Sequence, residues 1–313
     1  MLSRIAESLF WIGRYVERAD DTARIVDAQV QRMLEDPWLD EHDACSSLLA
    51  VMGAADRLPP EEPITRRTLL DVLAYDPVSP TSIAGSLAAA RENARRAREV
   101  VSSEMWEALN TTYYAIPTRV RAASAHRFAG WVRERAAVVT GIADSTMSRD
   151  AGYQFLVLGR SLERTDMTAR LLATTVLDAG PSWQTVLHSC GAYEAFLRTY
   201  RGGRSGGRSD AQAAEFLLLD RLFPRSLVNA LATAERCLED LDPDAGRVGY
   251  ADDARRRLAW TRSQLEFRSP AELLDDLVSE MERAQQTASK VSDAVSRRYF
   301  PKGIGTEWVP EAM

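Results

Sequence analysis

The amino-acid sequence predicts an all-α protein, a helical bundle of about 11 or 12 helices formed by two repeated halves related by a pseudo-two-fold axis. Three observations support this fold class. Apolar residues recur at helical rather than strand spacing along most of the chain. Proline and glycine clusters divide the chain into segments of helical length. A stretch close to the N-terminus recurs at an offset of 146 residues.

The first half is expected to contain five helices. With Ser3 as its N-cap, the first extends to about residue 35, where Pro37 follows and ends it. The others are expected over residues 43–57, 65–74, 80–113 and 117–146, and Pro80 and Pro117 would each occupy a first helical turn. The first helix has the four–three apolar spacing of a helix packed in a bundle, carried by Ile12, Val16, Ala19, Ala23, Val26 and Val30.

The second half follows the same plan and is expected to contain six helices. Their predicted ranges are 150–178, 182–200, 211–222, 225–241, 250–266 and 270–298. Residues 1–146 and 147–300 are interpreted as the two repeat halves of one composite body, followed by an irregular tail over 301–313. Trp308 in that tail is expected either to pack on the body or to dock into a partner.

Composition narrows the possible functions. The 313 residues include 45 acidic and 39 basic side chains, a net charge of −6 that argues against broad affinity for nucleic acid or anionic membrane. No run approaches the roughly 18 apolar residues that a membrane span needs, so we expect a cytoplasmic protein without membrane contact. The three cysteines are odd in number and form no zinc pattern, which indicates reduced core residues.

The internal repeat is the most informative feature of the sequence. Residues 13–30 read GRYVERADDTARIVDAQV, and residues 159–176 read GRSLERTDMTARLLATTV, with nine of 18 positions identical. A second match pairs Pro80-x-Ser82 with Pro224-x-Ser226. The polar positions are preserved better than the apolar ones, which indicates that a constraint acts on the polar face.

Three interpretations of this polar face remain open. In the first, it is a network buried between the halves, with Arg–Glu pairs three residues apart, Asp–Arg pairs four residues apart, and Gly13 and Gly159 allowing close helix approach. In the second, the same side chains line a cleft for an anionic substrate. In the third, they dock a partner. The candidate residues are Arg14, Glu17, Arg18, Asp20, Arg24, Arg160, Glu163, Arg164, Asp166 and Arg170.

No catalytic constellation can be identified from the sequence. The three histidines are outside any E-x-x-H or H-E-x-x-H pattern, so no metal site is expected. There is no G-x-S-x-G, and no residue can be named as a nucleophile. The catalytic residues are therefore unknown, and the chain is not expected to be an enzyme on its own.

The opening S-R-x-A-E-S-L-F-W-I-G-R-Y-V-E-R-A-D-D-T-A-R resembles the alpha-E family, helical bacterial proteins named for a Glu-Arg motif. Here the motif is Glu17-Arg18, repeated as Glu163-Arg164. The resemblance implies a companion of a circularly permuted ATP-grasp protein, with a transglutaminase-like peptidase as a further partner. It also implies that ATP and Mg are bound by the partner ligase, and no cofactor by this chain.

The leading functional hypothesis is a non-catalytic subunit or scaffold for an ATP-grasp amide or peptide ligase. The alternative is a ligand-binding or catalytic module that holds an anionic substrate in an Arg/Glu-lined cleft. RNA or tRNA binding through the arginine-rich segments near 91–98 and 119–135 is a weaker alternative.

Overall fold

The structure, a computed structural model, describes residues 2–57, 63–117, 124–177, 180–200, 210–243 and 252–301. Within these ranges the chain forms fourteen α-helices and no β-strand, which confirms the predicted all-α bundle. None of the described helices is long and apolar enough to cross a membrane.

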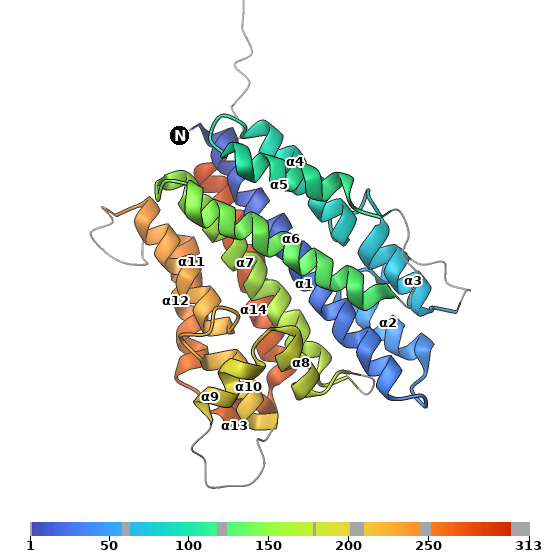
Figure 1. The fold of residues 1–313 in the computed structure, drawn as a ribbon. Coiled ribbons are helices and arrows are strands. Elements are labelled where there is room, and N and C mark those ends of the chain that lie inside the picture. Colours follow the sequence, from blue (N-terminus) through green and yellow to red (C-terminus); the bar gives the residue numbers. More distant parts are fainter. Residues whose placement is uncertain are drawn as a thin grey trace, which may run out of the picture.

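Two long helices, α1 (Ser3–Glu35) and α7 (Ala151–Thr174), lie against each other in the middle of the bundle (Figure 1). The six apolar positions predicted to form the packing seam of α1 are all buried. Burying a continuous apolar stripe along each helix is the main favourable contribution to such packing. The polar repeat lies on these same two helices, so the fold places its two copies next to each other.

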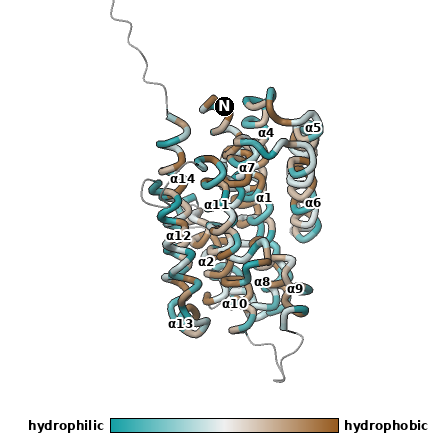
Figure 2. Tube along the Cα trace, turned by 90° about the vertical axis from the view of Figure 1, so that its left-hand side faces the viewer, coloured by the Kyte–Doolittle hydropathy of each residue, from teal (hydrophilic) through white to brown (hydrophobic). Residues whose placement is uncertain are grey.

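Helices of both halves surround this central pair. In the first half, α4 (Ile83–Arg96) and α6 (Ala125–Thr146) pack on α1, with α5 (Ser103–Tyr114) outside them. In the second half, α11 and α14 pack on α7, with α12 outside them; these helices span Leu227–Leu241, Leu277–Tyr299 and Asp253–Glu266. Figure 2 shows α1 and α7 between α12 and α14 on one side and α5 and α6 on the other.

Short helices complete one end of the bundle. The first half contributes α2 (Glu41–Val51), a 3₁₀ turn η1 (Ala55–Arg57), α3 (Arg66–Leu70) and a π-helical turn η2 (Asp71–Tyr75). The second half contributes α8 (Trp183–Ser189), α9 (Tyr193–Thr199), α10 (Asp210–Leu219) and α13 (Pro270–Asp275).

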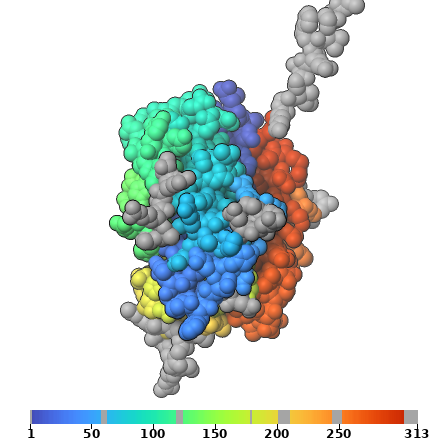
Figure 3. All heavy atoms as spheres, turned by 90° about the vertical axis from the view of Figure 1, so that its right-hand side faces the viewer, coloured from blue at the N-terminus to red at the C-terminus, as the bar shows by residue number. Residues whose placement is uncertain are grey.

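On the face shown in Figure 3, the red surface of α14 borders the blue and cyan surface of the first half.

Three helices predicted as continuous are divided in the structure. The segment 80–113 becomes α4 and α5, because Ser102 starts a new helix by accepting a hydrogen bond from the Met105 amide. The segment 182–200 becomes α8 and α9, since Gly191 has φ +63°, a left-handed conformation that ends a helix. The segment 270–298 becomes α13 and α14 at Asp276.

The predicted helix starts also need correction. Ser3 is the first helical residue, and the N-cap is Leu2, which offers no capping side chain. Pro80 precedes α4, whose cap is Ser82, with its hydroxyl accepting from the Gly85 amide. The start predicted at Pro117 would extend through 118–123, outside the described residues, and α6 begins at Ala125.

The turns before α4 and α11 have the same hydrogen bonds. Ser82 donates from Oγ to the Asp76 carbonyl, and Ser226 donates from Oγ to the Asp220 carbonyl. Each aspartate accepts from two amide groups of its own turn. The match between residues 80–82 and 224–226 therefore corresponds to two turns of the same construction. The duplication itself stays a prediction.

The core is continuous across the two halves. Phe10 of α1 and Phe155 of α7 both contact Phe300, with ring centroids 5.6 Å apart in each case. The three cysteines are buried and unpaired, as predicted. Trp308 and the tail beyond residue 301 are outside the described residues, so the predictions made for them are not addressed.

Candidate functional site

The repeated Glu-Arg motifs meet at the contact between α1 and α7. The carboxylate of Glu163, which is fully buried, accepts from Arg18 through two bonds, from Nε to Oε1 at 2.5 Å and from Nη2 to Oε2 at 2.9 Å. Arg14 also donates from Nε to Oε2 of Glu163, at 2.6 Å. Two guanidiniums therefore hold one buried carboxylate, and the Arg18 pair has the two-bond geometry that arginine forms with carboxylates.

The reciprocal contact holds Glu17, which is also buried. Arg164 donates from Nε to Oε1 at 2.6 Å and from Nη2 to Oε2 at 2.9 Å. Each Glu-Arg motif thus supplies the carboxylate for the arginine of the other. The remaining Nη1 of Arg18 donates to the Pro80 carbonyl at 3.1 Å, and that of Arg164 donates to the Pro224 carbonyl at 3.2 Å.

Two glycines allow the helices to approach this closely. A Cβ atom added to Gly13 would overlap the Leu156 carbonyl oxygen, and one added to Gly159 would overlap the Phe10 carbonyl oxygen. Glycine is needed at both positions because the backbone of one helix lies against the other. The close approach that the sequence predicts for Gly13 and Gly159 agrees with this arrangement.

Further along the helices, two aspartate–arginine pairs also extend across the interface. Arg24 contacts Asp20 at 3.2 Å and donates from Nη1 to the Ser189 carbonyl at 2.5 Å. Arg170 contacts Asp166 at 3.0 Å and donates from Nη1 to the Val51 carbonyl at 2.5 Å. The predicted pairs four residues apart are therefore present, and each also binds backbone of the opposite half.

The pairs predicted three residues apart are replaced by contacts between helices. Arg14 binds Glu163 rather than Glu17, and it donates from Nη1 to the Ser292 hydroxyl at 2.9 Å. Arg160 lies 3.6 Å from Asp144 of α6. Because α1 and α7 lie close together at Gly13 and Gly159, each glutamate pairs with arginines of the opposite helix instead of the arginine three residues away on its own helix.

The two halves differ in one group of charges. Arg225, from the turn before α11, contacts Oε1 of Glu17 at 3.0 Å and forms ion pairs with Asp20 and Asp21. In the aligned repeats, position 167 is Met where the first half has Asp21, and position 81 is Thr where the second half has Arg225. Arg225 was not among the predicted site residues. The sequence could have pointed to Arg225, because it is the residue that differs between the two matching Pro-x-Ser segments.

The carboxylates of Glu17, Asp20 and Asp21 could otherwise resemble a metal site. One oxygen from each lies within 4.8 Å of the others, and all three residues are buried. The guanidinium of Arg225 contacts all three and takes the place a cation would need. This arrangement gives the cluster a resident positive charge from the protein itself.

Electrostatics separate the carboxylates into two groups. Burial opposes ionisation of Glu17, but Arg164 and Arg225 outweigh it and lower its pKa to about 2. Burial likewise opposes ionisation of Glu163, and Arg14 and Arg18 lower its pKa to about 2. Because both values are below the usual 4.5, their contribution to stability is present above pH 4.5 and is lost as pH falls toward 2.

Asp21 behaves in the opposite way. Burial raises its pKa to about 8, and the neighbouring charges of Glu17 and Asp20 add to this against the opposing effect of Arg225. The Oδ2 atom of Asp21 has no hydrogen-bond partner within the described part of the chain. Burial therefore favours the protonated form of Asp21 at neutral pH, although the side chain also contacts Arg225.

The ten predicted residues thus form a buried or half-buried set, in which all but Arg160 pair with another member, rather than the lining of an open cleft. Their guanidiniums are bound by carboxylates or backbone carbonyls, so a ligand would first have to break an existing buried pair. This geometry agrees with the interpretation of a network between halves.

A family model described as an alpha-helical domain with a conserved ER motif matches residues 1–300. The chain belongs to the Alpha-E family. The Glu-Arg dipeptides at 17–18 and 163–164 fit that description, and in this Alpha-E chain they bind each other across α1 and α7.

Relatives of this Alpha-E chain are longer proteins. Uncharacterized proteins from Mycobacterium bovis and Mycobacterium tuberculosis are each 25% identical over 339 aligned residues. The alignment covers 98% of this chain and 38% of each relative. The chain therefore spans less than half the length of these relatives. No solved structure matches it.

Proposed function

We propose that this chain is a non-catalytic subunit or scaffold of a cytoplasmic system in which a circularly permuted ATP-grasp protein forms amide or peptide bonds. The observation that carries the proposal is the 38% coverage of the mycobacterial relatives, which join this helical unit to further chain. A domain that is joined to further polypeptide in its relatives is suited to act together with another protein.

The buried network supports a structural role for the Alpha-E motif. The charged side chains of the two Glu-Arg motifs in the central helices bind each other and so hold the two halves together. The chemistry of ligation would then belong to the partner, which would bind ATP and Mg. A transglutaminase-like peptidase would be a further partner of the same system.

Co-purification tests this proposal directly. The tagged chain would be isolated from its native host at low salt, and the bound proteins identified by mass spectrometry. We expect an ATP-grasp protein in near-equal amount, and co-elution of the two purified proteins on a sizing column at micromolar concentration. Separate elution of a folded chain and a folded ligase would contradict the subunit role.

The same assay has an internal control in the exposed residue Arg67, which lies on α3. Arg67→Glu should leave co-elution unchanged, whereas Glu163→Ala, which weakens the contact between the halves, should reduce it. If Arg67→Glu reduced co-elution as much as Glu163→Ala, the α3 surface rather than the intact two-half body would be the docking element.

The alternative of an anionic substrate in an Arg/Glu cleft has less support, because the guanidiniums proposed to bind it are already paired. RNA binding has little support for the segment near 91–98. Arg95 and Arg96 both pair with Glu92, and Arg91 donates from Nε to Asn110 at 2.7 Å. Part of the other segment, near 119–135, is outside the described residues.

A further inference from the structure

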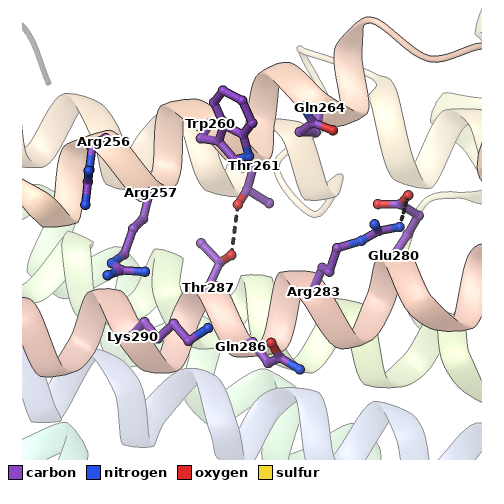
Figure 4. A pocket seen from close by; sticks show the side chains of 10 residues that line it. All are labelled: Arg256, Arg257, Trp260, Thr261, Gln264, Glu280, Arg283, Gln286, Thr287 and Lys290. Atoms are coloured by element: carbon purple, nitrogen blue, oxygen red, sulfur yellow. Dashed lines mark hydrogen bonds and ion pairs between the residues drawn. The ribbon is translucent and has the colours of Figure 1, made fainter.

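A groove separates the exposed sides of α12 and α14, away from the Glu-Arg network. It has a volume of about 590 Å³, within the range of about 300–1,000 Å³ common for ligand sites. Figure 4 shows its two walls, with Arg257, Trp260 and Gln264 on α12 and Arg283, Gln286 and Lys290 on α14; Arg257 extends toward α14, whereas the Trp260 ring is drawn on the side of α12 away from α14. Its floor is crossed by a hydrogen bond between the Thr261 and Thr287 hydroxyls, at 2.8 Å.

The charge of the groove differs from that of the whole chain. Its lining has four cations, Arg256, Arg257, Arg283 and Lys290, and one acid, Glu280, which already pairs with Arg283. The chain as a whole carries a net charge of −6. The positive lining is therefore a local feature that favours an anionic ligand.

Several of the lining groups are available for binding. Among the described residues, the side chains of Lys290, Gln264 and Gln286 are exposed and have no hydrogen-bond or ion-pair partner. Arg256 and Arg257 share the single carboxylate of Asp253, which leaves further N–H donors on each guanidinium free. A ligand could meet these donors without breaking a buried contact.

Trp260 gives the groove an apolar contact surface. Its side chain is 69% exposed, although tryptophan buries a large area wherever it finds a partner. Tryptophan and arginine are the residues most often found at the energetic centre of binding surfaces. Side-chain amides such as those of Gln264 and Gln286 can each donate to a peptide carbonyl and accept from a peptide N–H.

The spacing of the cations matches a short extended chain. Arg283 and Lys290 are seven positions apart on α14, a separation of about 10 Å along the helix axis. Roughly three residues of extended peptide span the same length. Four cations are few for a nucleic-acid surface, whose affinity depends on many phosphate contacts.

We propose that the α12–α14 groove binds a short, carboxylate-rich peptide segment in an extended conformation. The cations hold its side-chain carboxylates, Gln264 and Gln286 bind its backbone, and Trp260 covers its apolar atoms. This peptide site is a separate activity from the proposed subunit role. It can be tested on the isolated chain without any ligase.

The test measures fluorescence anisotropy of a labelled, N-acetylated tetraglutamate peptide titrated with the full chain at low salt. We expect saturable binding, with Kd raised at least about tenfold by Lys290→Glu and by Trp260→Ala. Both side chains are exposed, so the fold should be retained. Arg67→Glu on α3 is the matched control and should leave Kd unchanged.

Three results would overturn the proposal. These are an unchanged Kd in both groove variants, equal binding of a tetraglutamine peptide, and tighter binding of an oligouridylate than of the acidic peptide. Because no second protein is present, failure of this binding would leave the co-purification result intact. Conversely, a chain that binds the peptide but no ligase would lose only the proposed subunit role.

Discussion

Glu163 is a buried charge that is held by cations of the protein itself. Its carboxylate has no exposure to water and receives hydrogen bonds from Arg14 and Arg18. Taking the three charged groups out of water is costly, and the contacts offset that cost only while all partners are present. The consequence of losing one partner should therefore be large.

We expect Glu163→Ala to lower the free energy of unfolding by about 3–5 kcal/mol, because two guanidiniums would remain buried without a counter-charge. Urea denaturation followed by circular dichroism measures this change. Glu7→Ala, at an exposed position of the neighbouring helix α1, is the control and should change stability by less than about 0.5 kcal/mol. Similar losses in both variants would show that the network contributes no special stability.

Asp21 should give the protein an unusual pH dependence. Its folded-state pKa of about 8 lies above the ordinary value of 3.8, so the folded state keeps a proton that the unfolded state releases. Between these values, rising pH lowers the free energy of unfolding by up to about 1.4 kcal/mol per unit from this group. The stabilising contribution is complete below pH 3.8 and is lost as pH passes through 8.

Asp21→Asn removes this titration and should flatten the stability profile between pH 5 and pH 8, the window below the Asp21 pKa of about 8. Thermal unfolding measured across this range would detect the difference from the unmodified protein. Asp43→Asn, at an exposed position of α2, is the matched control and should leave the slope unchanged. Parallel profiles for Asp21→Asn and the unmodified chain would mean that Asp21 is ionised throughout.

At the scale of residues, the sequence predicted which side chains belong to the Glu-Arg network better than it predicted which of them pair. Repetition identified Glu17, Arg18, Glu163 and Arg164, because a merely solvated face would have diverged. The pairing of each glutamate with the arginine of the opposite helix depends on the distance between the two helices. The spacing of residues within one helix carries no information about that distance. Arg225 was missed for the same reason, since it comes from a turn some 200 positions away from the carboxylates it binds.

At the scale of helices, the crossing of α1 and α7 depends on two glycines. Both face backbone carbonyls of the opposite helix, so any larger side chain must push the helices apart. The same crossing brings the Glu-Arg motifs within hydrogen-bond distance. The two glycines and the Glu-Arg ion pairs beside them therefore depend on the same close contact between α1 and α7.

Gly13→Ala should destabilise the protein by about 1–3 kcal/mol, because its Cβ would overlap the Leu156 carbonyl. Gly141 on α6 is a matched control, since a Cβ added there meets no atom within 4 Å. Gly141→Ala should instead stabilise by about 0.5–1 kcal/mol through helix propensity. Chemical denaturation of both variants gives the comparison, and a neutral Gly13→Ala would contradict the close crossing.

The helical type of the segments was more predictable than the number of helices or their ends, since the described residues form fourteen α-helices where 11 or 12 were expected. The long central helices have a clear apolar period, and the structure places α1 at the range expected. The breaks at Ser102 and Gly191 were missed because capping hydroxyls and left-handed glycines also occur inside or beside helices without ending them. Whether such a residue ends a helix depends on how the helix that follows it packs against the rest of the protein.

At the scale of the whole molecule, the two halves depend on each other. Each half supplies the guanidiniums for the glutamate of the other, and Phe300 at the end of α14 contacts rings from both central helices. A half on its own would expose its apolar seam and leave its glutamate without partners. The chain is therefore expected to fold as one unit.

Fragments 1–147 and 148–313 test this dependence, since the division falls in the exposed turn between α6 and α7. Expressed separately, each should be insoluble or lack a cooperative thermal transition. Expressed together, they should co-purify in equal amounts with the circular dichroism spectrum of the intact chain. A separate fragment that unfolds cooperatively as a monomer would show that the halves are independent domains.

The crossed Glu-Arg pairs also bear on how the protein survives among cellular proteases. Partial opening of either half would strand a buried carboxylate on one side and arginines on the other, so partly open forms are high in energy. Proteases cut mainly such partly or fully open forms, at a rate set by their population. Degradation of the bundle should therefore depend on rare global unfolding. The protein should then resist proteolysis longer than a protein of equal unfolding free energy that opens locally.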